Sequence, residues 1–273
     1  MTAGTEELVE KKPSALVRFV DSFFDPVLGI LDDIGETVLL FGRAMTWMVR
    51  PPFRLAQLAI AVEFIGAGSL FIVGLVGTFT GMAFTASTIT GFRQFGAEGM
   101  VGGVVGLALA RELAPVLAGV VVTARAGSTM ASELGNMRVT EQIDAITTMG
   151  VSPVQYLVVP RILATVITLP ALALAFGIAG MLGAYVVAVV LQAIDPGVFM
   201  DRVRTFVEWA DIRELLIKSV IFAIIISTIC CKKGFHASGG ARGVGEATAK
   251  AVVASIVTVF AANYIATTIL TGL

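Results

Sequence analysis

The sequence predicts an all-α membrane protein with about five transmembrane helices, preceded by an amphipathic helical segment at the membrane interface. The chain has 273 residues, of which 56% are hydrophobic and 14% charged, whereas soluble domains carry about 25% charged residues. Five stretches approach or exceed the roughly 18 apolar residues that indicate a membrane-spanning helix. They are residues 64–92, 99–124, 162–194, 215–231 and 251–273.

The N-terminal part of the chain differs from the rest in its charge pattern. Residues 1–13 are mostly polar and predict a disordered cytosolic tail. Over residues 14–54, apolar positions recur at helical spacing beside five acidic residues, which favours amphipathic helices on the inner leaflet, broken near Pro26 and Gly35. The alternative is a soluble helix that packs on another subunit. The five spans then occupy residues 55–273.

Small residues in the first two spans predict closely packed helices. Gly77 and Gly81 lie four positions apart, as do Gly99 and Gly103. This spacing lets two helix backbones approach one another. The contact is expected inside the bundle or across a dimer interface.

The later spans carry proline and glycine signals. Pro160 and Pro170 predict that the long third stretch begins at the interface and then kinks into the membrane. Turn residues at 195–197 end that stretch, and 198–213 should form a short outer segment. A glycine-rich connector is expected over 232–246, before the last span.

The second span holds two adjacent charges, Arg111 and Glu112, with twelve uncharged residues on either side. Each charge costs about 2.5–3.5 kcal/mol at a helix centre on the insertion scale, so a charge there marks a functional site by default. The functional hypothesis is a polar contact or gate for the headgroup of an amphiphile, and the structural one is a lock between two helices. Lys218, near the outer end of the fourth span, either snorkels to the interface or pairs with Glu112 or a lipid phosphate.

The polar segment 125–161 is predicted to be a cytosolic loop with short helices. Thr140 is expected to cap the first helix, which Gly150 ends, and Ser152-Pro153 should start another helix. A short amphipathic helix between two spans suits docking into a groove of a soluble partner. The alternative is a helix that packs on its own bundle.

The distribution of basic residues predicts the orientation. If the N-terminus is cytosolic, thirteen of the nineteen Lys and Arg residues lie in inner segments and four in outer segments. This bias places the N-terminus and residues 125–161 inside the cell and the C-terminus outside.

Several functions are disfavoured by what the sequence contains. His236 is the single histidine and is expected in a loop, so neither a histidine-based metal cluster nor a serine–histidine site within the membrane is available. The chain has no phosphate-binding P-loop motif, so any ATP would be hydrolysed by another chain. Cys230 and Cys231 are adjacent and are expected to pack as small hydrophobic residues. A net charge of −1 argues against a nucleic-acid partner.

About 50 contiguous residues resemble the MlaE/YrbE permease family, the membrane subunits of ABC systems that carry lipids between the inner membrane and the outer envelope. The motifs are RELAPV at 111–116, ARAG at 124–127, ELGNMRVTEQID at 133–144, MGVSP at 149–153 and VPR at 159–161. Ala114 departs from the family pattern, in which many relatives have glycine.

The resemblance implies a homodimer bound to two ATPase subunits and to MCE-domain proteins outside, in the bacterial inner membrane, with no cofactor on this chain. It implies a lipid pocket that opens outward at the dimer interface and is lined or gated by Glu112, Arg111 and Leu113, near Lys218. Apolar contacts to the lipid would come from Phe84, Phe92 and Phe95. The element that touches the ATPase would be 133–149, and its residues include Glu133, Arg138, Thr140, Glu141, Asp144 and Met149.

Two alternative functions remain open at this point. An ion-coupled secondary transporter would use Glu112 as its titrating group and would need no ATPase. A membrane scaffold would use the same charges for assembly alone. The first alternative is tested by transport without an ATPase, and the second by lipid movement in a Glu112 variant.

Overall fold

The computed structural model describes residues 15–51 and 54–271. The chain divides into two compact units, residues 1–42 and 43–273. The expected tail at 1–13 lies outside the described residues. The described part of unit 1 belongs entirely to α1 (Ala15–Met48), which continues into unit 2.

Helix α1 is one unbroken helix of 34 residues. The predicted breaks at Pro26 and Gly35 are therefore wrong. A proline removes one backbone hydrogen bond, and a glycine loses more backbone entropy on folding than other residues do. A long helix tolerates both costs. Large apolar side chains of α1 are exposed, namely Leu31, Ile34, Val38 and Leu39, so the helix presents an uncovered apolar surface. Whether that surface lies on a membrane stays a prediction.

The described part of unit 2 contains five helical runs that are long and apolar enough to cross a membrane, which confirms the predicted all-α fold class. They are Leu55–Arg93, Glu98–Val139, Val154–Leu191, Trp209–Phe235 and Gly240–Leu270.

Most of these runs are composite helices. The first contains α2 (Leu55–Val62), the π-helical turn η1 (Glu63–Ala67) and α3 (Gly68–Arg93). The second contains the 3₁₀ turn η2 (Glu98–Met100), α4 (Val101–Ala108), the π-turn η3 (Leu109–Leu113), α5 (Ala114–Val122), the π-turn η4 (Thr123–Gly127) and α6 (Ser128–Val139). A π-turn inserts an extra residue and rotates the helix faces on either side of it, and such turns are frequent at functional sites.

The remaining elements complete the bundle. Helix α7 (Gln142–Thr148) precedes the third run, which contains the π-turn η5 (Val154–Val158), α8 (Val159–Tyr185) and the π-turn η6 (Val186–Leu191). They are followed by α9 (Pro196–Phe206), α10 (Trp209–Phe235) and α11 (Gly240–Thr271). The third run passes through Pro160 and Pro170 and begins directly after Pro153, the start that Ser152-Pro153 predicts.

The structure corrects the predicted loop at 125–161, because the second run stays helical as far as Val139. Hydroxyl groups on α6 donate to carbonyl oxygens one turn back, for example Ser128 Oγ to Ala124 O at 2.6 Å. The helix also packs against α10 and α11. Polar composition alone suggested a loop, whereas these hydroxyl groups find acceptors within the helix and tertiary packing on α10 and α11 stabilises it.

Two smaller corrections concern helix ends. Thr140 does not cap α7 but ends α6, with its hydroxyl donating to Asn136 O at 2.7 Å. The residue before α7 is Glu141, whose φ of 59° lies in the left-handed region. The expected glycine-rich connector at 232–246 is helical on both sides of residues 236–239, and Gly239 and Gly240 take positive φ at the turn.

The glycines of the first two spans pack inside the chain. Helix α3 lies along α8, and a Cβ added at Gly81 would collide with the backbone of Gly180. Gly102 and Gly103 of α4 face Phe199 and Phe206 of α9 in the same way. These contacts join α3 to α8 and α4 to α9 within unit 2. The intrachain alternative for these glycines is therefore the one that the structure supports.

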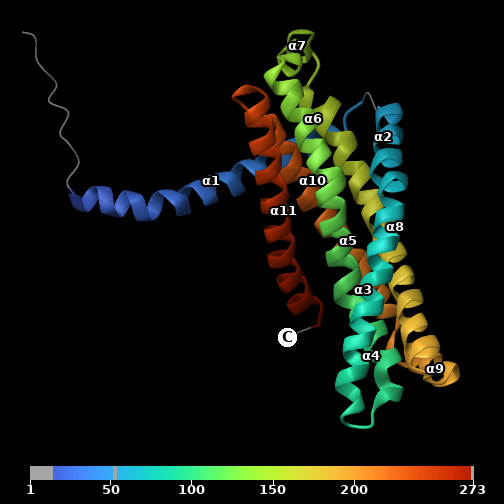
Figure 1. Ribbon diagram of the computed structural model, residues 1–273. Coiled ribbons are helices and arrows are strands. Elements are labelled where there is room, and N and C mark those ends of the chain that lie inside the picture. Colours follow the sequence, from blue (N-terminus) through green and yellow to red (C-terminus); the bar gives the residue numbers. More distant parts are fainter. Residues whose placement is uncertain (1–14, 52–53, 272–273) are drawn as a thin grey trace, which may run out of the picture. The chain divides into compact units, whose positions relative to one another are not determined.

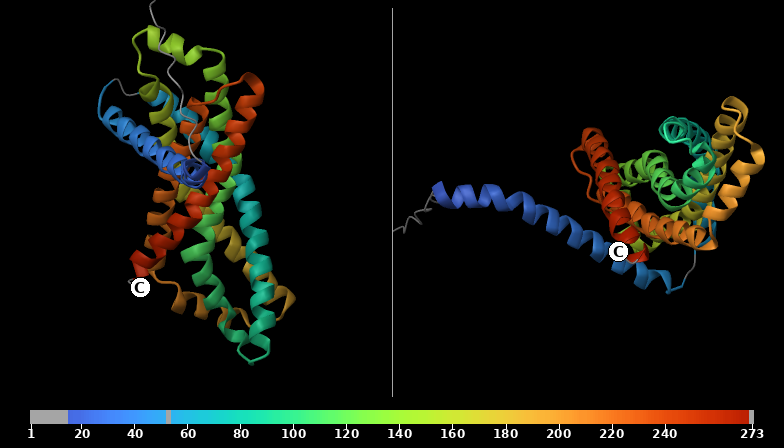
Figure 2. Two further views of the ribbon diagram at one scale, coloured as in Figure 1. Left: turned by 90° about the vertical axis from the view of Figure 1, so that its left-hand side faces the viewer. Right: turned by 90° about the horizontal axis from the view of Figure 1, so that it is seen from below.

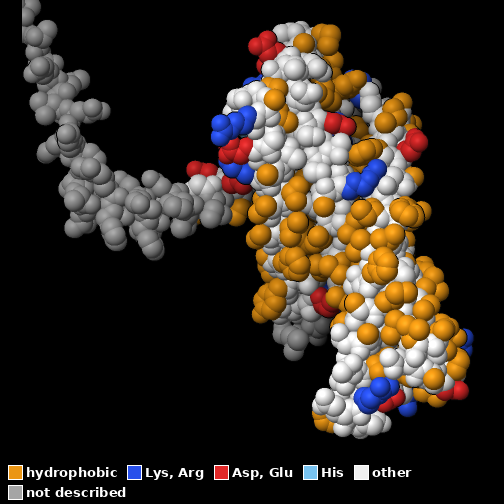
Figure 3. Space-filling model, in the orientation of Figure 1, with side chains coloured by type: hydrophobic (Ala, Val, Ile, Leu, Met, Phe, Trp, Pro, Cys, Tyr) orange, Lys and Arg blue, Asp and Glu red, His pale blue; other side chains and the backbone are white. Residues whose placement is uncertain are grey.

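Within unit 2, α11 lies at one edge of the bundle, while α3, α8 and α9 lie at the other (Figures 1 and 2). Helices α5, α6 and α10 lie between them, and α10 packs on both α8 and α11. Figure 3 shows hydrophobic side chains gathered over the middle of the visible face, with most charged side chains near the α7 end and the α4–α9 end. This distribution fits a membrane-spanning bundle.

Candidate functional site

The candidate site is built on the π-turn η3, in the interior of the second helical run. Its extra residue is accommodated by a bond from the N–H of Ala114 to Leu109 O. Arg111 and Glu112 lie in this turn and take their closest charged partners from different parts of α10. The two adjacent charges are thus held by two separate ion pairs, and both pairs connect the second run to the fourth.

Glu112 is held by three side chains from two helices. Lys218 Nζ lies 2.9 Å from Glu112 Oε1, and Thr267 Oγ1 donates to the same oxygen at 2.9 Å. Asn263 Nδ2 donates to the second oxygen, Oε2, at 2.7 Å. The carboxylate therefore joins the second run to both α10 and α11.

Lys218 is fully buried at the centre of this network. Its Nζ donates to Arg111 O and to Thr267 Oγ1, each at 2.9 Å. It also lies 2.7 Å from Glu214 Oε1, an ion pair without hydrogen-bond geometry. With 0% of its side chain exposed, Lys218 does not snorkel to the interface. The ion pair with Glu112 confirms the alternative in which these two residues pair. The surrounding oxygens offset the large cost of burying an ammonium group.

Arg111 pairs with Asp211 at the start of α10. Arg111 Nε donates to Asp211 Oδ1 at 2.6 Å, and Asp211 Oδ2 accepts the backbone N–H of Glu208 at 2.8 Å. Glu208 and Asp211 together form a capping box, in which each side chain accepts a backbone N–H of the other residue. One buried carboxylate thus both caps α10 and fixes the arginine.

The charges are only partly enclosed. The side chain of Glu112 is 40% exposed and that of Arg111 is 42% exposed, whereas Asp211 and Lys218 are buried. A cavity of about 290 Å³ lies beside Arg111, and its lining includes Arg111, Asp211, Arg213, Glu214, Ile217 and Leu270. The buried members hold the site in place, and the open members can contact a polar ligand.

Comparison with known proteins identifies the family. Residues 58–269 match the family described as permease MlaE. This chain belongs to the MlaE permease family. The resemblance noted in the sequence is therefore confirmed.

Curated relatives cover most of the permease. A probable ABC transporter permease protein of Rickettsia felis is 36% identical over 92% of this chain and 97% of its own length. A probable ABC transporter permease protein of Synechocystis is 42% identical over 74% of this chain and 77% of its own length. The chloroplastic protein TRIGALACTOSYLDIACYLGLYCEROL 1 of Arabidopsis thaliana is 40% identical over 75% of this chain and 58% of its own length.

The other predicted pocket residues of this permease lie in two places. Leu113 follows Glu112 and packs against the core, as does Phe84. Phe92 and Phe95 share a second cavity of about 350 Å³ at the α3–α4 end, and Phe95 is 84% exposed. That cavity shares no lining residue with the one beside Arg111. The structure thus brings Phe92 and Phe95 together but does not bring them to Arg111.

The predicted coupling residues lie at the α7 end of the permease (Figure 1). Arg138 of α6 pairs with Asp144 of α7 at 2.6 Å, which ties the two helices together. Thr140 and Glu141 form the turn between them. Met149 is 71% exposed at the far end of α7.

Glu133 has a different setting from the other predicted coupling residues. Its Oε2 lies 2.8 Å from Arg161 Nη2 of α8, and the two side chains line a common cavity. Its part in coupling stays a prediction.

Sequence reasoning missed four residues of the network: Asp211, Glu214, Asn263 and Thr267. A signal was present for Glu214, Asn263 and Thr267, but not for Asp211. Glu214 lies four positions before Lys218 and can reach it on one helix face. Asn263 and Thr267 are also four apart in a span that is otherwise largely apolar, and polar side chains in such spans commonly hydrogen-bond across helices.

Proposed function

We propose that this chain is the permease subunit of an ATP-driven lipid transporter, which moves a phospholipid-like molecule between the inner membrane and the outer envelope. ATP is hydrolysed on a partner ABC ATPase, and the lipid passes through an MCE-domain protein outside the membrane. The observation that carries the proposal is the half-open network around Glu112 and Lys218. Within the apolar spans, this network provides charged groups that a lipid headgroup can reach.

The chemistry of the cavity supports a lipid headgroup as the ligand. Arg111 and Arg213 offer guanidinium groups, which bind phosphate with paired, charge-assisted hydrogen bonds. Ile217 and Leu270, which also line the cavity, are apolar and are 39% and 41% exposed. An amphiphile with a phosphate and acyl chains is complementary to such a mixed wall.

One relative adds independent support. The name of the Arabidopsis protein contains that of a diacylglycerol lipid. The names of the bacterial relatives identify ABC transporter permeases. We extend the lipid substrate and the ABC assembly that these names indicate to this chain as parts of the proposal.

The proposal includes a homodimer. The outer face of α11 carries large exposed apolar side chains, among them Val253, Val257, Phe260, Tyr264, Ile265 and Ile269. The same helix supplies Asn263 and Thr267 to Glu112. A second copy near this helix would help to enclose the lipid pocket, as the family resemblance implies.

The proposal also assigns an orientation and a role to α7. The permease is a multi-pass protein of the bacterial inner membrane, with its N-terminus in the cytosol and its C-terminus outside, as the bias of Lys and Arg indicates. In this orientation α6 and α7 face the ATPase. Nucleotide binding would then move 133–149 and change the pocket around Glu112.

The proposal is tested with the permease purified together with its partner subunits and reconstituted in lipid vesicles. We expect ATP-dependent transfer of a labelled phospholipid, which Glu112→Ala abolishes while the complex remains assembled. Glu112→Gln serves as a second variant, because its amide oxygen still accepts from Lys218. Mass spectrometry of co-purified lipid identifies the substrate.

The same experiment separates the alternatives. Transport by the permease alone under a proton gradient, without nucleotide, would favour the ion-coupled secondary transporter. Normal lipid transfer by Glu112→Ala would show that the pocket is assigned to the wrong residues. Weakened assembly of that variant, with lipid transfer intact, would instead favour the scaffold.

A further inference from the structure

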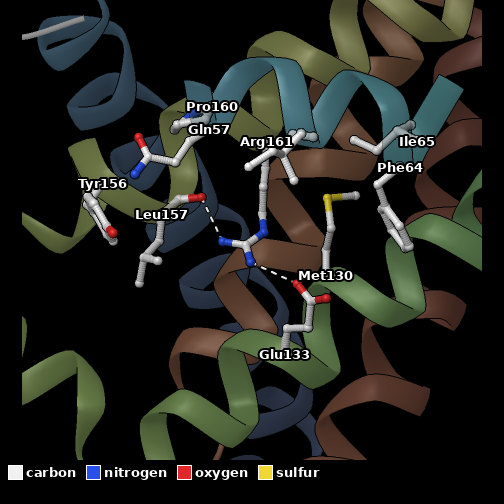
Figure 4. A pocket seen from close by; sticks show the side chains of 11 residues that line it. Gln57, Phe64, Ile65, Met130, Glu133, Tyr156, Leu157, Pro160 and Arg161 are labelled. Atoms are coloured by element: carbon white, nitrogen blue, oxygen red, sulfur yellow. Dashed lines mark hydrogen bonds and ion pairs between the residues drawn. The ribbon is translucent and has the colours of Figure 1, made fainter. Parts of the chain in front are cut away.

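A third cavity lies at the α7 end of unit 2, away from the network around Glu112. It has a volume of about 260 Å³ and lies between the α2–η1 segment, α6 and the η5–α8 segment. Figure 4 shows the side chains that line it, which come from these three segments. It shares no lining residue with the cavity beside Arg111.

The floor of this cavity is apolar and buried, while one rim is open. Ile65, Met130 and Leu157 are at most 7% exposed. Ile60, on the rim, is 67% exposed. The volume is below the roughly 300–1,000 Å³ of a site for a drug-sized molecule. A slot with these properties fits one slender apolar chain that enters past Ile60.

Two cation–π pairs hold aromatic side chains of the wall in place. The guanidinium of Arg125 lies 5.0 Å from the centre of the Phe64 ring, and its Nη1 donates to Phe64 O at 3.0 Å. The guanidinium of Arg54 lies 4.3 Å from the centre of the Tyr156 ring. Each contact is worth about 0.5–2 kcal/mol, depending on how far it is desolvated. The aromatic walls are therefore positioned before any ligand binds.

An ion pair crosses one end of the cavity. Arg161 Nη2 lies 2.8 Å from Glu133 Oε2, and Arg161 Nη1 donates to Leu157 O at 2.9 Å. These bonds, within the described part of the chain, use two of the five N–H groups of a guanidinium. The side chain of Glu133 is 52% exposed and that of Arg161 is 18% exposed. Both groups keep bonding capacity at the cavity.

We propose that this slot binds one acyl chain of a zwitterionic phospholipid, with the phosphate at Arg161 and the ammonium at Glu133. A phosphate oxygen can accept from the remaining guanidinium N–H groups, and the ammonium can donate to the second carboxylate oxygen. A headgroup with both charges complements the ion pair without leaving either side chain unpaired. This binding site is distinct from the cavity beside Arg111.

The test uses a photoactivatable phospholipid and the position of the resulting crosslink. The full-length permease, with its co-purifying subunits, is placed in nanodiscs of phosphatidylethanolamine that contain a trace of phosphatidylethanolamine with a diazirine in its acyl chain. Met130 is 2% exposed, so a crosslink there reports entry into the slot rather than contact with surrounding lipid. We expect a crosslink at Met130.

A matched pair of variants in α2 tests whether the slot itself is occupied. Ala61 lines the cavity, whereas Ala59 is exposed and lies outside the lining. Ala61→Trp should lower labelling of Met130 about tenfold, equivalent to about 1.4 kcal/mol of binding, and Ala59→Trp should leave it unchanged. Equal labelling in both variants would overturn the proposal.

The headgroup is tested with the same photoactivatable chain on other lipids. We expect stronger labelling of Met130 by phosphatidylethanolamine than by phosphatidylglycerol, and the weakest labelling by diacylglycerol. Arg161→Gln should reduce labelling by phosphatidylethanolamine and leave labelling by diacylglycerol unchanged. It also provides a second variant if Ala61→Trp does not fold. Labelling by diacylglycerol equal to that by phosphatidylethanolamine would overturn the role of the ion pair. Inorganic phosphate should not compete, and effective competition would identify a free-phosphate site instead.

Discussion

Glu112 and Lys218 lie 106 positions apart in the chain, and their side chains meet in a 2.9 Å ion pair. Lys218 is fully buried, while Glu112 remains 40% exposed. Lys218 is thus enclosed by the helix bundle, whereas Glu112 is accessible to a ligand. This asymmetry explains how charged groups can be both a helix lock and a candidate binding site.

Replacing the buried partner should destabilise the protein strongly. Lys218→Met leaves Glu112 and Glu214 without their common cation, and breaking a buried pair costs about 3–5 kcal/mol. We expect this loss in the free energy of unfolding, measured by circular dichroism in mixed micelles. Lys250→Met is the matched control, because Lys250 pairs with Glu246 at an exposed surface of α11 and should matter little. Equal stability of the two variants would contradict a central role for Lys218.

The double role of Asp211 predicts a graded effect. Asp211→Ala removes the acceptor of Arg111 and that of the Glu208 N–H, whereas Asp211→Asn retains one oxygen acceptor. Loss of a cap costs about 0.5–2 kcal/mol, so the start of α10 should open more often in the alanine variant. Hydrogen exchange of residues 208–214 measures this opening.

The control for Asp211 is an ion pair at the surface. Asp144→Ala removes a pair with Arg138 whose two side chains are 59% and 41% exposed, and pairs of this kind are worth less than about 1 kcal/mol. It should leave exchange in α10 unchanged. Equal exchange in Asp211→Ala and the unmodified protein would show that the buried carboxylate is not needed as a cap.

Two glycines of α3 should respond differently to alanine. A Cβ at Gly81 would collide with the backbone of Gly180, while a Cβ at Gly74 would meet no atom within 4 Å. Overpacking of this kind costs about 1–3 kcal/mol, and more when backbone must move. We expect a lower unfolding midpoint for Gly81→Ala and an unchanged or slightly higher one for Gly74→Ala. The reverse order would show that α3 and α8 do not pack as described.

The two cysteines should be unreactive in the folded permease. Cys230 and Cys231 are free and fully buried, and Cys230 Sγ lies 3.5 Å from Ser255 Oγ. Fully buried thiols are inert because a reagent cannot reach them. A membrane-permeant maleimide should modify neither cysteine until the protein is unfolded, as followed by intact-protein mass. Met149→Cys, at an exposed position, is the positive control.

Some features of the site follow directly from local sequence. The cost of placing Arg111 and Glu112 within an apolar span was sufficient to identify them as candidate site residues. A charge in hydrocarbon has few groups that can stabilise it, so its presence there needs a reason. Pairing of Lys218 with Glu112 could be stated only as one alternative, since nothing local indicates which way the side chain of a given helix position points. Asp211 was missed because its sequence context is that of an ordinary helix start.

The sequence by itself determined the number of spans and the all-α class, because every backbone polar group in a bilayer must be bonded internally and long apolar stretches then become helices. Only the tertiary structure decided which charges meet. Those contacts depend on helix rotation, which the π-turn η3 changes along the second run. Such rotations arise from packing between segments far apart in the chain, so no local stretch of sequence contains them.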